Sequence, residues 1–326
     1  MRIAILDDYQ HCVSSLKCFS LLAEHSVQIF NDTSKDLDEL AKRLNGAQAL
    51  VLTRERTAVS SQLLARLPNL KLISQTGKVA EHIDVAACTA SGIAVAEGSG
   101  TGAATAELTW ALLLASRRHL LTEANRLKNG QWQSTLGQQL QGQRLGIWGY
   151  GRIGKQVANY GKAFGMKVWV WGRESSSNSA RADGFEVAPS LEAFCANSDV
   201  ISLHIRLNAA TRGIVTAGDL ALMKSSSVLI NTSRAELIEA GALAHSLRHG
   251  HPGFAAVDVF EDEPVLGANH PLLALPNALC TPHLGFVERD NYERYFGSAF
   301  ENINNFVAGK PSGIVNPEAL SKRSGD

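Results

Sequence analysis

An apolar run that ends in closely spaced glycines constrains the fold of this chain more than any other feature. Residues 145–154 read LGIWGYGRIG, and a helical pattern follows at once. This order predicts a strand, a tight turn and a helix. Gly149 permits the turn, Gly151 lets the backbone approach a pyrophosphate, and Gly154 lets the helix pack on the strand. The residues predicted to surround such a dinucleotide are Gly149, Tyr150, Gly151, Arg152, Ile153 and Gly154.

Short β-rich runs alternate with helical patterns on both sides of this turn, which predicts parallel sheets with crossover helices. A glycine-rich seam at residues 97–103 separates two such series and indicates a hinge. We expect one long helix at 104–128, an exposed serine-rich loop at 174–179, and a helix at 287–307 that returns to the first series. The expected strands are residues 2–6, 27–30, 49–52, 70–73, 93–95, 145–148, 167–171, 200–204, 228–231, 254–259 and 278–280.

The two series predict two doubly wound parallel-sheet α/β domains. A Rossmann cofactor domain at residues 100–285 is inserted in a flavodoxin-like domain made of residues 1–99 and 286–326. The length of 326 residues agrees with this division, because it exceeds what one ordinary hydrophobic core accommodates.

Composition points to a small-molecule partner. The 31 basic and 31 acidic residues balance to a formal charge of zero, and no basic run exceeds a pair, so neither nucleic acid nor a membrane surface is expected as a partner. The acidic residues Asp7 and Asp8 interrupt the start before a secretory segment forms, so we expect a cytoplasmic protein. The five cysteines include no CxxC pair, so neither a disulfide framework nor a metal site is indicated.

Polar residues follow the expected strands of the second series. In chain order they are His204, Arg234, Asp258, Glu263 and His283. Ligands of open parallel sheets bind beyond the carboxyl ends of the strands, so a cation, a carboxylate and an imidazole are expected at one crevice. Hydride exchange at a 2-keto or 2-hydroxy acid needs these groups. An arginine grips the substrate carboxylate, a histidine exchanges the hydroxyl proton, and a carboxylate orients the imidazole.

Several ordered motifs together resemble the D-isomer-specific 2-hydroxyacid dehydrogenase family. They cover nearly the whole chain: GYGRIG at 149–154, INTSRAELIEAGAL at 230–243, DVFEDEP at 258–264, TPHLG at 281–285, AELTWALLL at 106–114 and ENINN at 301–305. The resemblance implies an NAD(P)-dependent oxidoreductase, similar to glyoxylate/hydroxypyruvate reductases or phosphoglycerate dehydrogenases. It also implies a homodimer formed through the cofactor domain.

The resemblance implies roles for individual residues. Arg234 would anchor the substrate carboxylate, Glu263 would partner the histidine, and His283 would be the acid/base. The cofactor would also meet His204, Thr232 and Asp258, the last beside the nicotinamide. The domain of residues 1–99 and 286–326 would bind substrate, and the residues expected to do so are Thr76, Gly77 and Lys78, together with Arg234.

Two departures from the family pattern leave the substrate unidentified. Arg206 stands where the family commonly has a proline, and the loop at 74–84 reads SQTGKVAEHID instead of the usual glycine-rich pattern. A rival function also stays open at this point, because relatives of such folds can act as nucleotide-sensing, protein-binding regulators. The joint presence of Arg234, Glu263 and His283 favours the enzyme.

The residues after the second expected strand of the cofactor domain predict which cofactor is used. NAD enzymes are expected to carry Asp or Glu about twenty residues past the glycines, where the carboxylate binds the ribose 2′-hydroxyl. This chain has Gly172 there, followed by Arg173 and the hydroxyl of Ser175. A guanidinium binds a 2′-phosphate well, so NADPH is predicted over NADH. The alternative is that Gly172 only eases a turn and Arg173 faces solvent, which leaves NAD as the cofactor.

Overall fold

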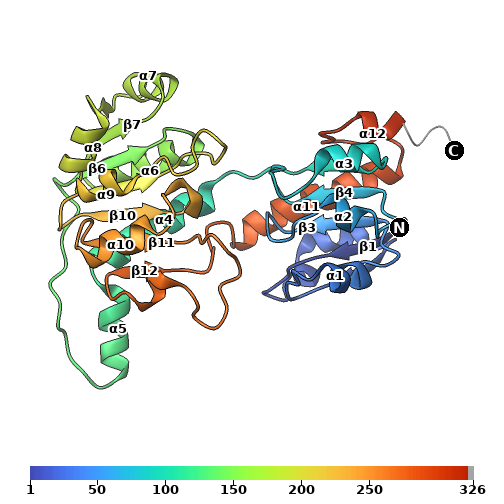
Figure 1. The fold of residues 1–326 in the computed structure, drawn as a ribbon, viewed down its shortest axis with the longest axis horizontal. Coiled ribbons are helices and arrows are strands. Elements are labelled where there is room, and N and C mark those ends of the chain that lie inside the picture. Colours follow the sequence, from blue (N-terminus) through green and yellow to red (C-terminus); the bar gives the residue numbers. More distant parts are fainter. Residues whose placement is uncertain (322–326) are drawn as a thin grey trace. The chain divides into compact units, whose positions relative to one another are not determined.

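The computed structural model describes residues 1–321, which form two compact units (Figure 1). The first unit contains Met1–Thr101 and the described residues from Glu288 onward, and the inserted unit contains Gly102–Val287. Each unit is built on its own parallel sheet. Two α/β domains with parallel sheets were predicted, and this fold class is confirmed.

The first unit has five parallel strands in the order β2-β1-β3-β4-β5. The strands are β1 (Arg2–Ile5), β2 (Ser26–Ile29), β3 (Ala49–Leu52), β4 (Leu72–Gln75) and β5 (Ala94–Glu97). The helices are η1 (Val13–Ser15), η2 (Lys17–Leu22), α1 (Leu37–Arg43), α2 (Ser61–Leu64), α3 (Val85–Ala90), α11 (Arg289–Val307) and α12 (Glu318–Ser321). Phe296 and Phe300 of α11 are fully buried, so the last long helix completes the core of this unit.

The inserted unit has seven parallel strands in the order β12-β11-β10-β9-β6-β7-β8. Its strands are β6 (Arg144–Trp148), β7 (Lys167–Trp171), β8 (Glu186–Val187), β9 (Val200–Leu203), β10 (Val228–Asn231), β11 (Phe254–Val257) and β12 (Ala278–Cys280). The chain runs outward from β6 to β8 and then resumes on the other side with β9. The order of strands therefore reverses between β6 and β9, which is where such sheets bind ligands.

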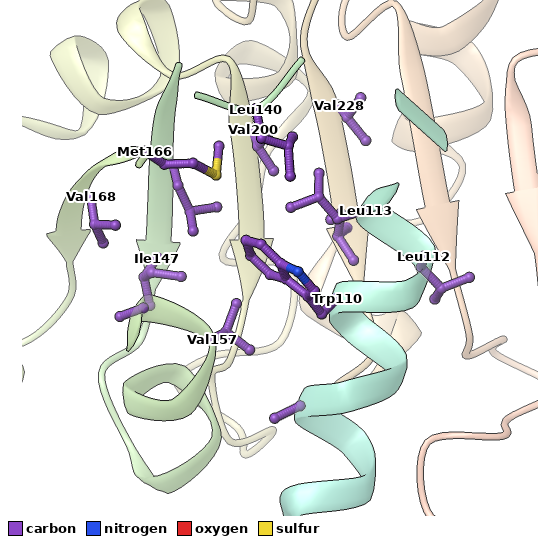
Figure 2. Packing of buried hydrophobic residues seen from close by; sticks show 14 of the residues in the cluster. Trp110, Leu112, Leu113, Leu140, Ile147, Val157, Met166, Val168, Val200 and Val228 are labelled. Carbon is purple, nitrogen blue, oxygen red and sulfur yellow. The ribbon is translucent and has the colours of Figure 1, made fainter. Parts of the chain in front are cut away.

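Helices cover both faces of this sheet. The helices of the unit are α4 (Ala103–Arg117), α5 (Leu120–Lys128), α6 (Arg152–Ala163), α7 (Glu174–Ala182), α8 (Leu191–Asn197), α9 (Ala217–Ala221), η3 (Ala235–Leu237), α10 (Ala242–Arg248) and η4 (Pro271–Ala274). Helix α5 is the exception to this packing, because none of its residues is buried. Figure 2 shows Trp110 of α4 and Val157 of α6 packed over one face together with Ile147 of β6. Phe194 of α8 belongs to the core of the opposite face.

Alternation along β6 explains how one strand serves both cores. Leu145 and Ile147 belong to the α4 side, whereas Trp148 belongs to the Phe194 side. Gly146 also faces Phe194, because a Cβ atom added there would lie 2.7 Å from the Phe194 ring. A larger residue at this position would push α8 away from the sheet.

Two predicted elements were wrong, and one strand was missed. The expected helix at 104–128 is broken into α4 and α5, because His119 adopts a left-handed conformation with φ of 50°. The serine-rich segment expected as a loop is part of helix α7, where Ser177 and Ala180 are buried. The missed strand β8 has only two residues, Glu186 and Val187, which is too short for a recognisable β pattern. Within residues 1–321, no helix is both long and apolar enough to cross a membrane.

The packing of Phe194 predicts a stability effect confined to the inserted unit. Its ring is fully buried and lies 5.8 Å from the rings of both Trp148 and Trp169. Phe194→Ala should lower the free energy of unfolding by about 3–5 kcal/mol, because a large cavity replaces the ring. All five tryptophans lie in this unit, so tryptophan fluorescence during urea denaturation follows its unfolding.

The matched control is Leu266→Ala, since Leu266 is 74% exposed in the same unit. This variant should stay within about 0.5 kcal/mol of the parent. Equal destabilisation by the two substitutions would contradict the proposed role of the Phe194 ring in the core.

Candidate active site

The carboxyl ends of the parallel strands bring the predicted residues of the inserted unit to one edge of its sheet. His204 follows β9, Arg234 follows β10, Asp258 follows β11 and His283 follows β12. These strands are consecutive neighbours in the order β12-β11-β10-β9, and β6 with its glycine turn comes next. The residues singled out by the sequence therefore occupy adjoining loops.

The glycine turn after β6 has little room for side chains. Gly149 has φ of 95°, and a Cβ atom there would lie 2.7 Å from the carbonyl oxygen of His204. A Cβ atom on Gly154 would lie 2.3 Å from the Gly149 carbonyl oxygen. At Gly151, by contrast, no atom lies within 4 Å of the Cβ position. The turn is tight against the protein at two glycines and open at the third, where a ligand can approach the backbone.

The start of helix α6 is suited to an anion. Gly151 is its N-cap residue, no side chain caps the first turn, and that turn contains no acidic residue. The backbone N–H groups and the helix dipole therefore favour negative charge at this end. The N-terminal end of α4 lies alongside, because a Cβ atom on Gly102 would lie 2.9 Å from the Ile153 side chain. These features fit the pyrophosphate of a dinucleotide.

The side chain of Tyr150, within the glycine turn, bonds to a residue of its own unit. Its hydroxyl donates to Asp183 Oδ2 at 2.9 Å, and the side chain is 4% exposed. Burial raises the pKa of the Tyr150 phenol, so it remains protonated. Asp183 also accepts from Lys155 Nζ at 2.9 Å. Asp183, in the loop after α7, is therefore bonded to the glycine turn through Tyr150 and to α6 through Lys155.

A histidine–carboxylate pair follows β12. His283 Nδ1 lies 2.6 Å from Glu263 Oε2, and the other oxygen of Glu263 accepts from the backbone N–H of Phe260 at 3.0 Å. The ring of Phe286 meets the imidazole edge to face at 5.3 Å. The two partners remain 20% and 25% exposed. Because Glu263 engages Nδ1, Nε2 is the nitrogen that can exchange a proton with a ligand.

Asp258 fixes the loop that carries this histidine. Its carboxylate is fully buried and accepts from Thr281 Oγ1 at 2.6 Å and from the backbone N–H groups of Leu284 and Gly285, each at 2.7 Å. Burial raises the pKa of Asp258, against the lowering by these donors. His283 itself has φ of 52°, so its unusual backbone conformation lies inside the segment that Asp258 holds.

Arg234 follows β10 in a turn organised by Asn231. The Asn231 side chain accepts from Ser233 N at 3.0 Å and donates to the Arg234 carbonyl at 2.8 Å. The half-buried guanidinium donates to the Ser233 carbonyl at 2.7 Å. The buried hydroxyl of Thr232 lies 2.7 Å from the hydroxyl of Thr109 in α4, and its contact with a cofactor stays a prediction.

His204 presents a neutral ring at the end of β9. Its Nε2 lies 2.9 Å from Ser202 Oγ, and its Nδ1 is buried without a protein partner. Burial lowers the pKa of His204 to about 3, so the imidazole is uncharged at neutral pH. Ser202 was not singled out from the sequence. Its only signal was its position two residues before His204 on a strand, which places both side chains on one face.

Gly172 lies beside the glycine turn. A Cβ atom there would lie 3.8 Å from Gly149 Cα and 3.2 Å from Ser176 Cβ. Arg173 is the N-cap residue of α7 and does not cap it through its side chain. Arg173 and Ser175 are both exposed. The segment predicted to decide the cofactor therefore lies next to the turn predicted to hold it.

The remaining predicted residues belong to the first unit and follow β4. Thr76 is 1% exposed, its hydroxyl donates to the Leu52 carbonyl at 2.9 Å, and it accepts from Arg54 N at 3.0 Å. Lys78 forms an ion pair with Glu97. The Thr76 hydroxyl thus holds two loops of its own sheet, and the role of Thr76, Gly77 and Lys78 toward a substrate stays a prediction.

Comparison with known proteins identifies the family. Residues 110–285 match the model of the D-isomer specific 2-hydroxyacid dehydrogenase NAD binding domain. Glyoxylate reductase of Aeropyrum pernix is 37% identical over 276 residues, which cover 81% of this chain and 82% of that protein. An oxidoreductase structure from Ralstonia solanacearum is 52% identical with a TM-score of 0.95 and covers 98% of both chains. A phosphoglycerate oxidoreductase from Vibrio cholerae is also 52% identical, with a TM-score of 0.93, over 95% of this chain and 99% of that one.

These proteins are named as reductases or oxidoreductases, which does not favour the alternative of a nucleotide-sensing regulator. The resemblance found from the motifs is confirmed. The chain belongs to the D-isomer specific 2-hydroxyacid dehydrogenase family, and it is an NAD(P)-dependent oxidoreductase that acts on 2-keto or 2-hydroxy acids.

Proposed function

We propose that this enzyme transfers a hydride between NADPH and a small 2-keto acid, with His283, Glu263 and Arg234 acting on the substrate. The main support for this proposal is the 2.6 Å distance between His283 Nδ1 and Glu263 Oε2, at the same edge of the sheet as the glycine turn. A nicotinamide bound there would supply the hydride. The protein must then supply a proton and hold the carboxylate of the acid.

His283 gives that proton to the keto oxygen during reduction and takes it back during oxidation of the hydroxy acid. Glu263 holds Nδ1 and stabilises the positive charge of the protonated ring. Its second oxygen is occupied by the backbone N–H of Phe260, so the carboxylate cannot rotate freely. The pair therefore keeps Nε2 in one orientation through both protonation states.

Arg234 binds the substrate carboxylate. A guanidinium offers two parallel donors that match a carboxylate, and its charge polarises the adjacent carbonyl. Relatives are named glyoxylate reductase and glycerate dehydrogenase, which supports a short 2-keto acid such as glyoxylate or hydroxypyruvate. Thr76, Gly77 and Lys78 of the first unit would contact the rest of the substrate. Because Glu97 pairs with Lys78, we expect backbone groups of this loop to contribute most.

The catalytic roles predict distinct kinetic signatures. His283→Ala should lower kcat for glyoxylate or hydroxypyruvate reduction by about two to four orders of magnitude, the contribution of a positioned acid/base. Arg234→Ala should raise KM and lower kcat together, because anchoring and polarisation fail at once. Stopped-flow and steady-state measurements of reduced-cofactor absorbance test both. The control is His249→Ala, which replaces an exposed histidine of the same unit and should leave turnover unchanged. Near-parental turnover of His283→Ala would contradict the role of His283 as acid/base.

The preference for NADPH rests on the residues after β7. Position 172 lies beside Gly149, where the adenosine ribose of a dinucleotide is expected, and it carries no carboxylate to bind a 2′-hydroxyl or repel a phosphate. Arg173 adds an exposed cation at the start of the nine-residue helix α7. The uncapped N–H groups of that turn and the Ser175 hydroxyl add donors. The carboxylate of Glu174 in the same turn would repel a phosphate. We expect bidentate binding of the phosphate by the Arg173 guanidinium to be stronger than this repulsion.

A double substitution tests the cofactor preference. Gly172→Asp with Arg173→Ala should move the ratio of kcat/KM from NADPH toward NADH, since it adds the ribose-binding carboxylate and removes the phosphate-binding cation. Gly172→Ala is the matched control, because it adds the same Cβ atom against Ser176 without a charge. A parent enzyme that uses NADH as well as NADPH would refute the preference, as would a double variant whose ratio does not change.

We also propose that the enzyme is a homodimer formed through α5 and the segment after it. Large apolar side chains are exposed there: Leu120, Leu121, Leu127, Trp132 and Leu136, the last two at 74% and 94%. A cluster of exposed apolar residues of this size marks a protein interface, and a second copy of the chain is the partner expected for the family.

The proposed interface predicts that substitutions within it lower the average molecular mass of the protein in solution. Trp132→Ser with Leu136→Ser should weaken dimer association roughly 30-fold or more, because buried aromatic and aliphatic side chains dominate interface energies. Sedimentation equilibrium measures the effect, with Leu266→Ser as a control of similar exposure elsewhere on the unit. A parent that is monomeric at every concentration contradicts the proposal.

A further inference from the structure

Arg206 is a cation whose role neither the catalytic groups nor the cofactor-specificity segment explains. It follows β9 by three residues and is exposed. Residues 204–218 contain no acidic side chain, and Arg206 forms no ion pair within the described part of the chain. Its charge is therefore available to a ligand at the carboxyl edge of the sheet.

The loop that carries Arg206 is held against the glycine turn. The N–H of His204 donates to the Trp148 carbonyl at 2.8 Å, which extends the β6–β9 ladder to the last residue before Gly149. The Cβ position of Gly149 is 2.7 Å from the His204 carbonyl oxygen and 3.2 Å from Ile205 Cγ1. The two residues before Arg206 are thus in contact with the first glycine of the turn.

The far side of this loop is closed by its own hydrogen bonds. Thr211 Oγ1 donates to the Arg206 carbonyl at 2.7 Å and accepts from Asn208 N at 2.9 Å. Ala210 N donates to Asn208 Oδ1 at 2.9 Å. The backbone at Arg206 is therefore fixed on both sides, and the long side chain alone is free to adjust to a ligand.

Arg206 lies next to the point where the order of strands in the sheet reverses. The order of strands reverses between β6 and β9, and a ligand of an open parallel sheet crosses this point. The α6 side of the crossing supplies the uncapped helix start and Arg152. Arg206 lies on the β9 side. A diphosphate at the crossing would lie between two arginines, Arg152 at the start of α6 after β6 and Arg206 in the loop after β9.

We propose that Arg206 is a cofactor-binding residue that pairs with the pyrophosphate of the dinucleotide from the β9 side. This inference rests on the proposed function, because it assumes a dinucleotide on the glycine turn. It assigns Arg206 a role common to NADH and NADPH, whereas Arg173 acts on the 2′-phosphate alone. The residue thus strengthens binding of either cofactor without choosing between them.

Direct binding tests the proposal without any turnover. Dissociation constants for NADPH, NADH and ADP-ribose are measured by quenching of tryptophan fluorescence and by calorimetry. Arg206→Ala should raise all three by about tenfold, as expected for the loss of one charge-assisted contact to phosphate. Arg206→Lys should recover part of the affinity, and the dependence of log Kd on log salt should be shallower in Arg206→Ala than in the parent.

The control is Arg212→Ala, an exposed arginine of the same segment that lies 3.9 Å from Glu236 and should leave every dissociation constant unchanged. Equal losses in Arg212→Ala overturn the proposal, as does parental affinity of Arg206→Ala for ADP-ribose. A loss for NADPH alone would place the contact at the 2′-phosphate and overturn it too. A parent that binds neither NADPH nor NADH refutes the proposed function itself, which is a different result.

Discussion

The buried carboxylate of Asp258 is the interaction on which the arrangement of the catalytic groups depends. It takes three donors from the five-residue stretch 281–285 and so fixes the backbone on both sides of His283. Glu263, which holds the ring of the same histidine, comes from the same loop after β11. One strand therefore supplies both the support of the histidine's backbone and the partner of its imidazole.

The dependence of the His283 loop on Asp258 explains why a carboxylate is buried here, although its desolvation costs free energy. A buried carboxylate loses its hydration, and two backbone N–H groups with one hydroxyl compensate for that loss. The hydrogen bonds are also directional, so they specify the conformation of the loop as well as its proximity. His283 can then keep a left-handed backbone, which an unsupported loop would relax.

The sequence predicted those parts of the molecule that local patterns encode. The glycine turn and the alternating strands led to the fold class. The polar residues after consecutive strands led to His283 and a carboxylate partner, and the resemblance to the family identified that partner as Glu263. The break at His119 had no such signal, because neither glycine nor proline marks the left-handed residue between the two helices. Helix α7 was missed because serines are poor indicators of a helix, and burial of Ser177 and Ala180 stabilises it.

The hydrogen-bond partners that the hydroxyl groups have within the protein were the least predictable part of the site. Thr76 and Thr232 stand where ligand contacts are expected, yet each bonds to its own unit, Thr76 to β3 and Thr232 to α4. A hydroxyl finds a partner through tertiary contacts that no spacing in the chain reveals. The same holds for Tyr150, which lies within the glycine turn but bonds to Asp183.

The three glycines of the turn are required for two different reasons. Gly149 and Gly154 are required by atoms of the protein itself, since their Cβ positions meet carbonyl oxygens at 2.7 and 2.3 Å. Gly151 is required by nothing in the protein, because its Cβ would point into open space. A descendant of this chain that lost its dinucleotide would still need the outer two glycines in order to fold, and only the middle one would become free to change. Glycine at the two outer positions therefore indicates the fold, and glycine at the middle position indicates that a ligand is bound.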